Sequence, residues 1–328
     1  MSEPGRQKPV PRSLRGAIIQ GMKPAGVALV FLIAPLFGQS PSVVASFGYT
    51  TPRPVTVAPG QVITLFARTG TTLIQALVAD VSSLPITLGG FSVALSQTFS
   101  TDSIALPILS AAPVQTCTGV QPLICANFTA ITVQIPFELV PNAASSRQPE
   151  NFAFVTVSDG GNAGEPVAIA PVSEQIHIVN TCDTSVNPPV EPCAPMFLHG
   201  DGTVVTSKKP AAPGETITLR AYGMGFGDSP VATGQPAPSP AVAVSGVTAE
   251  FRFGADVVVS RPAADAASLA VQFAPGAVGL YQASFTVPAI PDGTADCTAT
   301  AGNLTVVIAR GKSFDGAAFC VTNPQPQQ

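Results

Sequence analysis

Six cysteines carry the clearest chemistry in this sequence, and they fall into three local pairs. The pairs are Cys117 with Cys125, Cys182 with Cys193, and Cys297 with Cys320. Six cysteines allow fifteen pairings, so this connectivity rests on proximity along the chain and on the strand pattern described below. Zinc binding is a weaker interpretation, because there is no Cys-x-x-Cys and neither histidine stands at a ligand spacing. We predict three structural disulfides.

The two histidines are the candidates for a general base beside a nucleophile. His177 alternates with apolar residues, and His199 lies next to an Asp-Gly turn. A Ser-His-Asp site needs an exposed nucleophile within hydrogen-bond reach of the base, and no Gly-x-Ser-x-Gly elbow occurs. The acidic residues are scattered through turns, although counting alone leaves a pair of glycosidase carboxylates open. We predict no catalytic residue, no cofactor and no metal ligand, and therefore not an enzyme.

Three Gly-rich segments could bind ions or phosphates, but each is better explained as a turn. Residues 158–162 (Ser-Asp-Gly-Gly-Asn) and 200–203 (Gly-Asp-Gly-Thr) offer oxygen ligands for calcium, yet neither follows the EF-hand spacing. Asp and Gly supply the backbone angles of hairpin turns. Residues 223–227 (Gly-Met-Gly-Phe-Gly) follow a strand pattern but precede Asp-Ser-Pro, and proline opposes the helix that a phosphate loop requires.

The composition favours many short strands over long helices. Charged residues are 10% of the chain, whereas Gly (29) and Pro (34) are abundant. A length of 328 residues has room for about two domains. Tryptophan is absent and only three tyrosines occur, so the aromatic platforms of sugar-binding sites are scarce. We therefore expect an all-β protein of two domains.

Residues 1–40 are typical of a signal peptide or an N-terminal anchor. Five basic residues precede the apolar run 25–37, which is short for a membrane span of about 20 residues. No cysteine follows at once, so a lipid anchor is not expected. Without residues 1–40 the basic count falls from 15 to 10 and the acidic count from 19 to 18, a net charge of 10 − 18 = −8. That balance argues against nucleic acid or anionic lipid as partners.

One stretch of the chain occurs twice. Residues 57–67 (Val-Ala-Pro-Gly-Gln-Val-Ile-Thr-Leu-Phe-Ala) match residues 211–221 (Ala-Ala-Pro-Gly-Glu-Thr-Ile-Thr-Leu-Arg-Ala) at an offset of 154. Apolar residues alternate in both copies, which predicts strands that bury Ile63, Leu65 and Ala67 in one and Ile217, Leu219 and Ala221 in the other. Three further matches follow at an offset of 152: 131–136 onto 283–288, 152–155 onto 304–307, and 164–169 onto 316–321. We interpret the chain as an internal duplication.

Several short motifs resemble an uncharacterised C-terminal domain family of exported proteins from Solibacter and related Acidobacteria. They are Val-Val-Ala-Ser-Phe (43–47), Gln-Ile-Pro-Phe-Glu-Leu (134–139), His-Gly-Asp-Gly-Thr-Val (199–204), Tyr-Gly-Met-Gly (222–225) and Gly-Leu-Tyr-Gln (279–282). The resemblance covers most of residues 42–321 and implies tandem Ig-like, TIG-related modules and export, with no known activity. The Arg-Thr-Gly turn at 68–70, the cysteine pairs and two long insertions depart from the family pattern.

The predicted organisation consists of two Ig-like β-sandwiches and three connecting or terminal segments. A signal segment at 1–40 precedes sandwich one at 42–180, a disulfide-stapled linker at 181–195, sandwich two at 196–323 and a disordered tail at 324–328. Residues 100–127 and 256–273 are expected as insertions in surface loops.

Two functions from different classes remain. The first is a secreted structural, adhesive or scaffolding module at the cell exterior, which binds an unknown extracellular protein or associates with itself through strand edges. The second is binding of an extracellular polysaccharide at a loop-built site, which the scarcity of aromatic residues disfavours. Neither involves nucleic acid, or a membrane beyond the N-terminal segment.

Overall fold

The computed structural model describes residues 42–45, 55–118, 124–142, 151–183, 193–253, 269–291, 294–298 and 301–323. All the regular elements in these residues are β-strands, so the prediction of an all-β protein is confirmed. The described residues belong to one compact unit, Gly38–Gln328. The predicted signal segment (1–40) and tail (324–328) lie outside the described residues.

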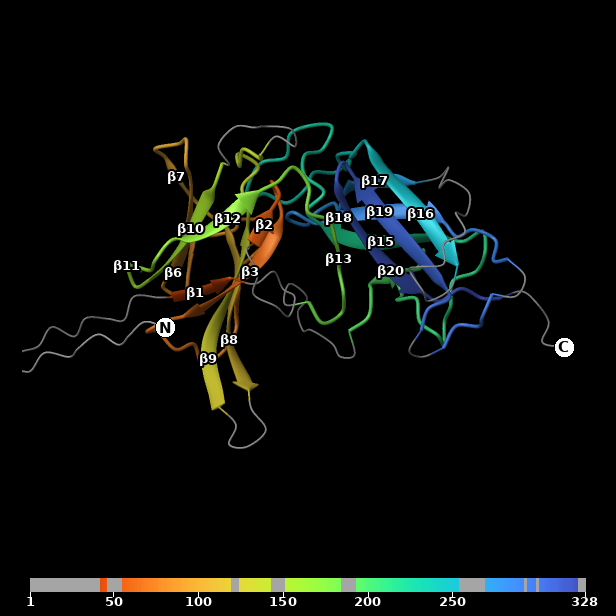
Figure 1. Cartoon of the computed structure of the whole chain (residues 1–328), viewed down its shortest axis with the longest axis horizontal. Coiled ribbons are helices and arrows are strands. Elements are labelled where there is room, and N and C mark those ends of the chain that lie inside the picture. The colour runs from red at the N-terminus through yellow and green to blue at the C-terminus, as the bar shows by residue number, and fades with distance from the viewer. Residues whose placement is uncertain are drawn as a thin grey trace, which may run out of the picture. The chain divides into compact units, whose positions relative to one another are not determined.

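The first half of the chain forms two sheets (Figure 1). One sheet has the order β1 (Ser42–Ala45), β3 (Val62–Arg68), β9 (Ile124–Gln134), β8 (Ile108–Thr118), β4 (Leu77–Val78). The other has the order β2 (Val55–Val57), β12 (Val167–Pro171), β10 (Ala153–Asp159), β6 (Phe91–Gln97), β5 (Thr87–Leu88), with β7 (Ser103–Ala105) beside β6 and β11 (Asn162–Ala163) beside β10. Neighbouring strands are antiparallel except β2 and β12. Leu65 and Val133 of the first sheet share one core with Val93 and Val155 of the second, as in a β-sandwich.

The second half also forms two sheets around its own core. One has the order β13 (His177–Ile178), β15 (Thr216–Tyr222), β18 (Tyr281–Thr286), β17 (Ala270–Phe273), with β14 (Phe197–Leu198) also on β15. The other has the order β16 (Val247–Phe253), β19 (Leu304–Arg310), β20 (Ser313–Phe319). Leu219 and Phe285 pack with Phe251 and Val306 from the facing sheet. Both halves are therefore built as paired sheets over an apolar interior.

The repeated stretch becomes β3 and β15, and the predicted burial is confirmed in both. Ile63, Leu65 and Ala67 are buried in one core, and Ile217, Leu219 and Ala221 in the other. The neighbouring strand also matches: Leu65 lies opposite Ile131 in β9, and Leu219 lies opposite Ala283 in β18. The offsets of 154 and 152 therefore join positions that are paired in the same way.

The predicted offset of 152 is wrong for the last two matched segments. It would place Thr305 and Val307 in the core positions of Ala153 and Val155, whereas Leu304, Val306 and Ile308 are the residues in the second core. The turns explain the error: Asp159 pairs with Asn162, and Arg310 pairs with Ser313, which gives an offset of 151. A shift of one residue exchanges the two faces of a strand.

The offset differs further for the strands that pair with β10 and β19, which are β12 and β20. Ala153 lies opposite Ile169 and Leu304 lies opposite Phe319, so Ile169 corresponds to Phe319 at an offset of 150. The predicted match of Ile169 with Val321 is therefore wrong by two residues. The order of the matched strands agrees between the halves, with β1-β3-β9-β8 corresponding to β13-β15-β18-β17 and β12-β10-β6 to β20-β19-β16, but duplication itself stays a prediction.

Two segments differ from the predicted organisation. β13 pairs with β15, and Ile176 and Ile178 belong to the second core, although they were assigned to the first sandwich. A boundary between the halves would thus fall after Pro171, ahead of the linker predicted at 181–195. The expected loop insertion at 100–127 contains β7, β8 and the start of β9, and the one at 256–273 ends in β17. β8 and β9 continue as a hairpin beyond the pairing of β9 with β3, which stops at Thr129 (Figure 1).

Candidate functional site

Two of the three predicted disulfides are present. Cys182 is bonded to Cys193 with their Cα atoms 4.9 Å apart, and Cys297 is bonded to Cys320 with 5.3 Å between Cα atoms. The second bond joins the segment before β19 to the residue after β20, because Cys320 directly follows that strand. For the third pair, the strand register places Cys117 opposite Cys125 at the Cα positions, and their side chains lie outside the described residues.

His177 takes part in a structural network. Its Nε2 lies 2.7 Å from Asp183 Oδ2, and its Nδ1 lies 3.7 Å from Asp315 Oδ2. The same carboxylate oxygens accept backbone N–H groups, Asp183 from Asn180 and Asp315 from Ile178, at 2.8 and 2.7 Å. The cluster therefore fastens the segment that leads into the Cys182–Cys193 disulfide.

His199 supports the repeated Ala-Pro-Gly turn of the second half. Its Nδ1 lies 2.6 Å from Glu215 Oε1, and its Nε2 lies 3.1 Å from the carbonyl oxygen of Lys209. Glu215 Oε2 accepts the N–H of Ala212 at 2.9 Å. The Ala212 N–H and then the His199 side chain hold the pKa of Glu215 below its usual value. The His199 ring and the Glu215 carboxylate thus bind each other and the backbone at Lys209 and Ala212, which fixes the turn.

The two Asp-Gly segments that were weighed as calcium ligands, and predicted to be turns, have internal partners. Asp201 Oδ1 accepts both the N–H and the hydroxyl of Thr203, and its Oδ2 lies 2.7 Å from Lys209 Nζ. The Lys209 ammonium and then the Thr203 hydroxyl lower the pKa of Asp201. Asp159 accepts the N–H and the hydroxyl of Thr71 at 2.8 and 2.6 Å. Within the described part of the chain, no three His, Cys, Asp or Glu side chains gather as metal ligands.

The Gly-rich segment 223–227 is a rigid turn that leads to an exposed ring. Gly223 and Gly225 have φ values of 73° and 75°, as expected for a turn that requires glycine. The Arg310 guanidinium donates to the carbonyls of Met224 and Phe226, the latter at 2.8 Å. The buried Tyr281 hydroxyl donates to the Gly225 carbonyl, and burial raises the pKa of Tyr281. These contacts fix the backbone of Phe226, whose side chain is 46% exposed.

Phe137 connects the two halves. It follows β9 of the first half but is buried in the core of the second half. Its ring centroid lies 5.9 Å from that of Phe273 in an edge-on arrangement. Its N–H donates to Thr233 Oγ1 at 2.9 Å, and Gly234 N–H donates to Gln134 Oε1 at 2.7 Å. The segment at the end of β9 is therefore anchored to β17 by ring packing and to the loop 231–235 by two hydrogen bonds.

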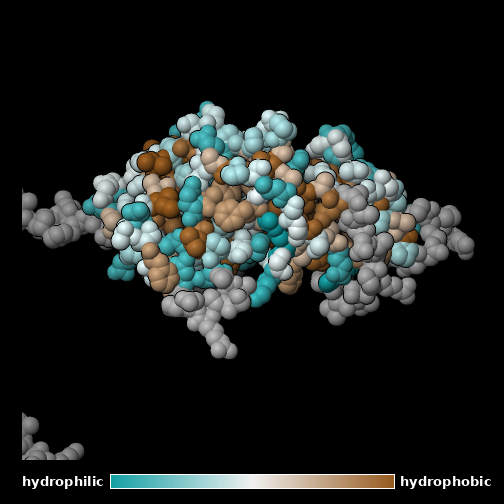
Figure 2. Space-filling view, turned by 90° about the horizontal axis from the view of Figure 1, so that it is seen from above, coloured by the Kyte–Doolittle hydropathy of each residue, from teal (hydrophilic) through white to brown (hydrophobic). Residues whose placement is uncertain are grey.

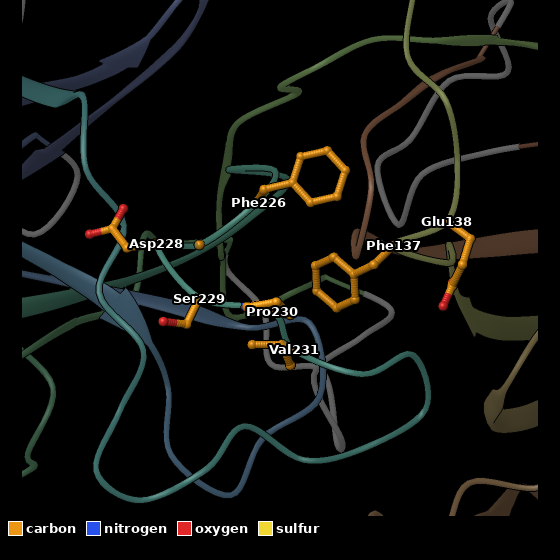
Figure 3. A pocket seen from close by; sticks show the side chains of 8 residues that line it. Phe137, Glu138, Phe226, Asp228, Ser229, Pro230 and Val231 are labelled. Atoms are coloured by element: carbon orange, nitrogen blue, oxygen red, sulfur yellow. The ribbon is translucent and has the colours of Figure 1, made fainter.

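A pocket opens where these two segments meet. It is about 490 Å³ in volume and is lined by Phe137, Glu138, Phe226, Gly227, Asp228, Ser229, Pro230 and Val231. The rings of Phe137 and Phe226 lie 6.4 Å apart at an interplanar angle of 39°. Figure 3 shows the two rings side by side, with Glu138 and Asp228 on opposite sides of them. Both carboxylates are exposed, so apolar walls carry an acidic rim.

The two carboxylates differ in their partners. Glu138 Oε2 accepts the Thr233 hydroxyl at 2.6 Å. Asp228 accepts the Ser245 N–H on one oxygen and the Ser245 hydroxyl on the other, at 2.9 and 2.7 Å. These bonds lower the pKa of Asp228, and the nearby Arg310 charge adds to the effect. The charge of Asp228 is thus more fully compensated than that of Glu138.

Neither Phe137 nor Phe226 is predicted as a site residue from the sequence. Phe137 stands in the motif 134–139 and Phe226 in the Gly-rich segment 223–227, and both segments are interpreted above through their backbone alone. The sequence signal for this site is Phe226 between Gly225 and Gly227. A large apolar ring in a turn has no neighbouring side chains to cover it, so an exposed ring there indicates an interaction site.

Two other cavities have linings that share no residue with this pocket. One of about 500 Å³ is lined by Asn142, Glu174, Lys312 and the 71% exposed Phe314, among others. Another of about 280 Å³ lies at the base of the β8–β9 hairpin beside Thr129. Figure 2 shows hydrophilic and hydrophobic residues interspersed over the face seen there, so no continuous apolar surface covers that face.

Among the described residues, no helix has the length and apolar character required to cross a membrane. No model of a known protein family matches the chain, and no curated protein is significantly similar to it.

Proposed function

We propose that the protein is a non-enzymatic structural and interaction module at the cell exterior, and that its two sandwiches act as one rigid unit. The observation that carries this proposal is the burial of Phe137, from the first half, in the core of the second. A linker that only tethered two domains would place no such side chain in the neighbouring interior. A rigid pair of sandwiches holds its loops at a fixed spacing, which suits a scaffold or an adhesive module.

Close backbone contacts support the rigidity of this junction. A Cβ atom at Gly279 would lie 2.4 Å from the carbonyl oxygen of Gly60, so the backbones of the two halves approach each other where only glycine fits. Thr56 in β2 also donates to Gln175 Oε1 at 2.6 Å, just before β13. Gln61 and Gln134 are fully buried here. Opening the junction would expose the buried Phe137 ring to water, which is costly.

The disulfides support an extracellular location. Cys182–Cys193 and Cys297–Cys320 are both formed in the described chain. Disulfides persist in oxidising compartments and are rare in a reducing cytosol. The acidic balance of the chain, net −4, also suits a soluble protein without nucleic-acid contacts.

The proposal includes an origin of the two halves by duplication. Gly60 N–H donates to the Ile135 carbonyl, and Gly214 N–H donates to the Val287 carbonyl, at 3.1 and 2.9 Å. In the first turn Gln61 accepts the Ala58 N–H, and in the second Glu215 accepts the Ala212 N–H. The same four-residue turn with the same side-chain bond therefore begins both repeated stretches. This supports membership of the exported Ig-like family that the motifs resemble.

Cell fractionation with thiol labelling tests this function. The full chain is expressed in a bacterial host with its own N-terminal segment, and each fraction is alkylated before and after reduction. We expect the protein outside the cytoplasm, with its cysteines alkylated only after reduction. Accumulation in the cytoplasm with free thiols would contradict the proposal.

Polysaccharide binding is a second candidate, favoured by one observation. Phe314 exposes 71% of its surface beside a cavity that Asn142, Glu174 and Lys312 also line. An exposed ring with amide, acid and amine groups is the arrangement that sugars contact. A glycan array probed with the wild-type chain and with Phe314→Ala tests it: binding that the variant loses would favour this function over the first.

A further inference from the structure

The junction pocket combines aromatic walls with negative charge. Phe137, Phe226, Pro230 and Val231 supply apolar surface, and Glu138 and Asp228 are its charged lining residues. Lys, Arg and His are all missing from the described lining. A volume of about 490 Å³ falls within the ~300–1,000 Å³ range of ligand pockets. The pocket is therefore large enough for a side chain or a small organic molecule.

The two rings are arranged so that a cation can lie near both. Their centroids are 6.4 Å apart and their planes are tilted by 39°. The face of a phenyl ring has a negative electrostatic potential, which attracts a cation within about 6 Å of the ring centroid. Phe137 is fixed by its burial, and the backbone of Phe226 is fixed by Arg310. Little conformational entropy would be lost when a ligand binds to such a preformed pair.

Glu138 supplies the available charge. Among the described residues it receives one hydrogen bond, from Thr233 Oγ1 to Oε2. Asp228 already accepts Ser245 on both oxygens and lies in the field of Arg310. A cation between the rings would therefore gain more from Glu138 than from Asp228.

We propose that this pocket binds an organic cation carried on an apolar stem, as in a lysine or arginine side chain of an extracellular polypeptide. The ammonium or guanidinium group lies between the two rings and Glu138, and its methylene stem covers Pro230 and Val231. The inference rests on the proposed function, because it assigns a chemistry to the partner of the interaction module.

Titration of the full chain with capped amino acids tests the charge requirement. The probes are Nα-acetyl-lysine amide and Nα-acetyl-arginine amide, whose side chains keep their charge, and the uncharged Nα-acetyl-norleucine amide. Binding is measured from NMR chemical shifts of the protein. We expect saturable shifts at Phe226 and Val231 with the two cations, and binding of norleucine about 5- to 10-fold weaker. Equal binding of the neutral probe would overturn the proposal in favour of a purely apolar pocket. Absence of saturable binding by every probe would overturn the site itself.

Variants locate the contacts. Phe226→Ala should weaken cation binding by about 5- to 10-fold, and Glu138→Gln should weaken it more than Asp228→Asn does. Both Phe226 and Glu138 are exposed, so the variants should unfold at the wild-type temperature, which a thermal melt verifies. Phe314→Ala, at the other cavity, is the matched control and should bind as wild type does. Loss of binding in the control alone would place the site elsewhere and refute the proposal.

A final arm distinguishes a polypeptide from a free amine as the source of the cation. A Gly-Ser peptide with one central lysine should bind at least as tightly as the capped residue if the pocket accepts a chain. Tight binding of free alkylamines with exclusion of the peptide would contradict the polypeptide partner. None of these outcomes affects the fractionation test, so a failure here is distinguishable from a failure of the proposed function.

Discussion

The ring of Phe137 meets the ring of Phe273 edge-on, with 5.9 Å between their centroids. Phe137 comes from the segment after β9 in the first half, and Phe273 ends β17 in the second. This contact places a side chain of the first half in the apolar interior of the second. The stability of the junction, the spacing of the loops and the shape of the pocket all depend on it.

Phe137→Ala should lower the free energy of unfolding substantially. Phe137 is only 9% exposed, and truncating a buried Phe typically costs about 3–5 kcal/mol through lost burial and the cavity left behind. Denaturation in urea, followed by circular dichroism, measures the change. The control is Phe99→Ala, because Phe99 is 73% exposed and its loss should cost at most about 0.5 kcal/mol. If the two substitutions lowered the free energy of unfolding equally, the packing of Phe137 in the second core would not contribute to stability.

Gly279→Ala should be more destabilising than Gly276→Ala. Both glycines have positive φ, 62° and 73°, so alanine strains the backbone at either position. Only at Gly279 would the new Cβ also collide, 2.4 Å from the Gly60 carbonyl, whereas nothing lies within 4 Å at Gly276. Thermal melts of the two variants isolate the contact across the junction. Identical melting temperatures would show that the close contact between Gly279 and the Gly60 carbonyl does not constrain the two halves.

Removing the Cys297–Cys320 disulfide should cost about 3 kcal/mol of stability. The bond closes a loop with a sequence separation of 23, and the loss of chain entropy in the unfolded state predicts that magnitude. The double variant Cys297→Ala, Cys320→Ala is compared with wild type by urea denaturation under non-reducing conditions. The Cys182–Cys193 bond spans only 11 residues, so its removal should cost slightly less on the same model. A reversed order would indicate that native contacts rather than loop length set the cost.

Glu215 should make the second turn sensitive to acid. Its pKa is depressed in the folded protein, mainly by the Ala212 N–H and then by His199. A depressed pKa stabilises the fold above the unfolded-state value, about 4.3 for glutamate, and that stabilisation is lost as the pH falls through the folded value. Glu215→Gln, which copies Gln61 of the first turn, removes this dependence. The difference in melting temperature between wild type and variant should shrink as the pH falls from about 5 towards about 3. A difference that grew on acidification would have the wrong sign.

The sequence predicted local features well, because they depend on neighbouring residues. Alternation identified the buried faces of β3 and β15, and the Pro-Gly turns marked where those strands begin. Cysteine proximity predicted the two disulfides that are described. Each of these signals lies within a window of a few residues.

Features that depend on long-range packing were missed or misplaced. The segment around Val306 is apolar at consecutive positions, so either face of β19 could have been the buried one, and the predicted register was wrong by one residue. Ile178 was assigned to the nearer domain, although its strand pairs with β15. Phe137 follows a proline at the end of a strand, and nothing local indicates that its ring enters the other core. The pocket could not be predicted because it depends on that ring.

Residual dipolar couplings of the full chain test the rigid junction most directly. Couplings from β3, β9 and β10 are fitted to one alignment tensor, and those from β15, β18 and β19 to another. We predict that the two tensors agree in magnitude and orientation for the wild type and diverge for Phe137→Ala. Different tensors in the wild-type protein would show that the halves move independently, which would contradict the account.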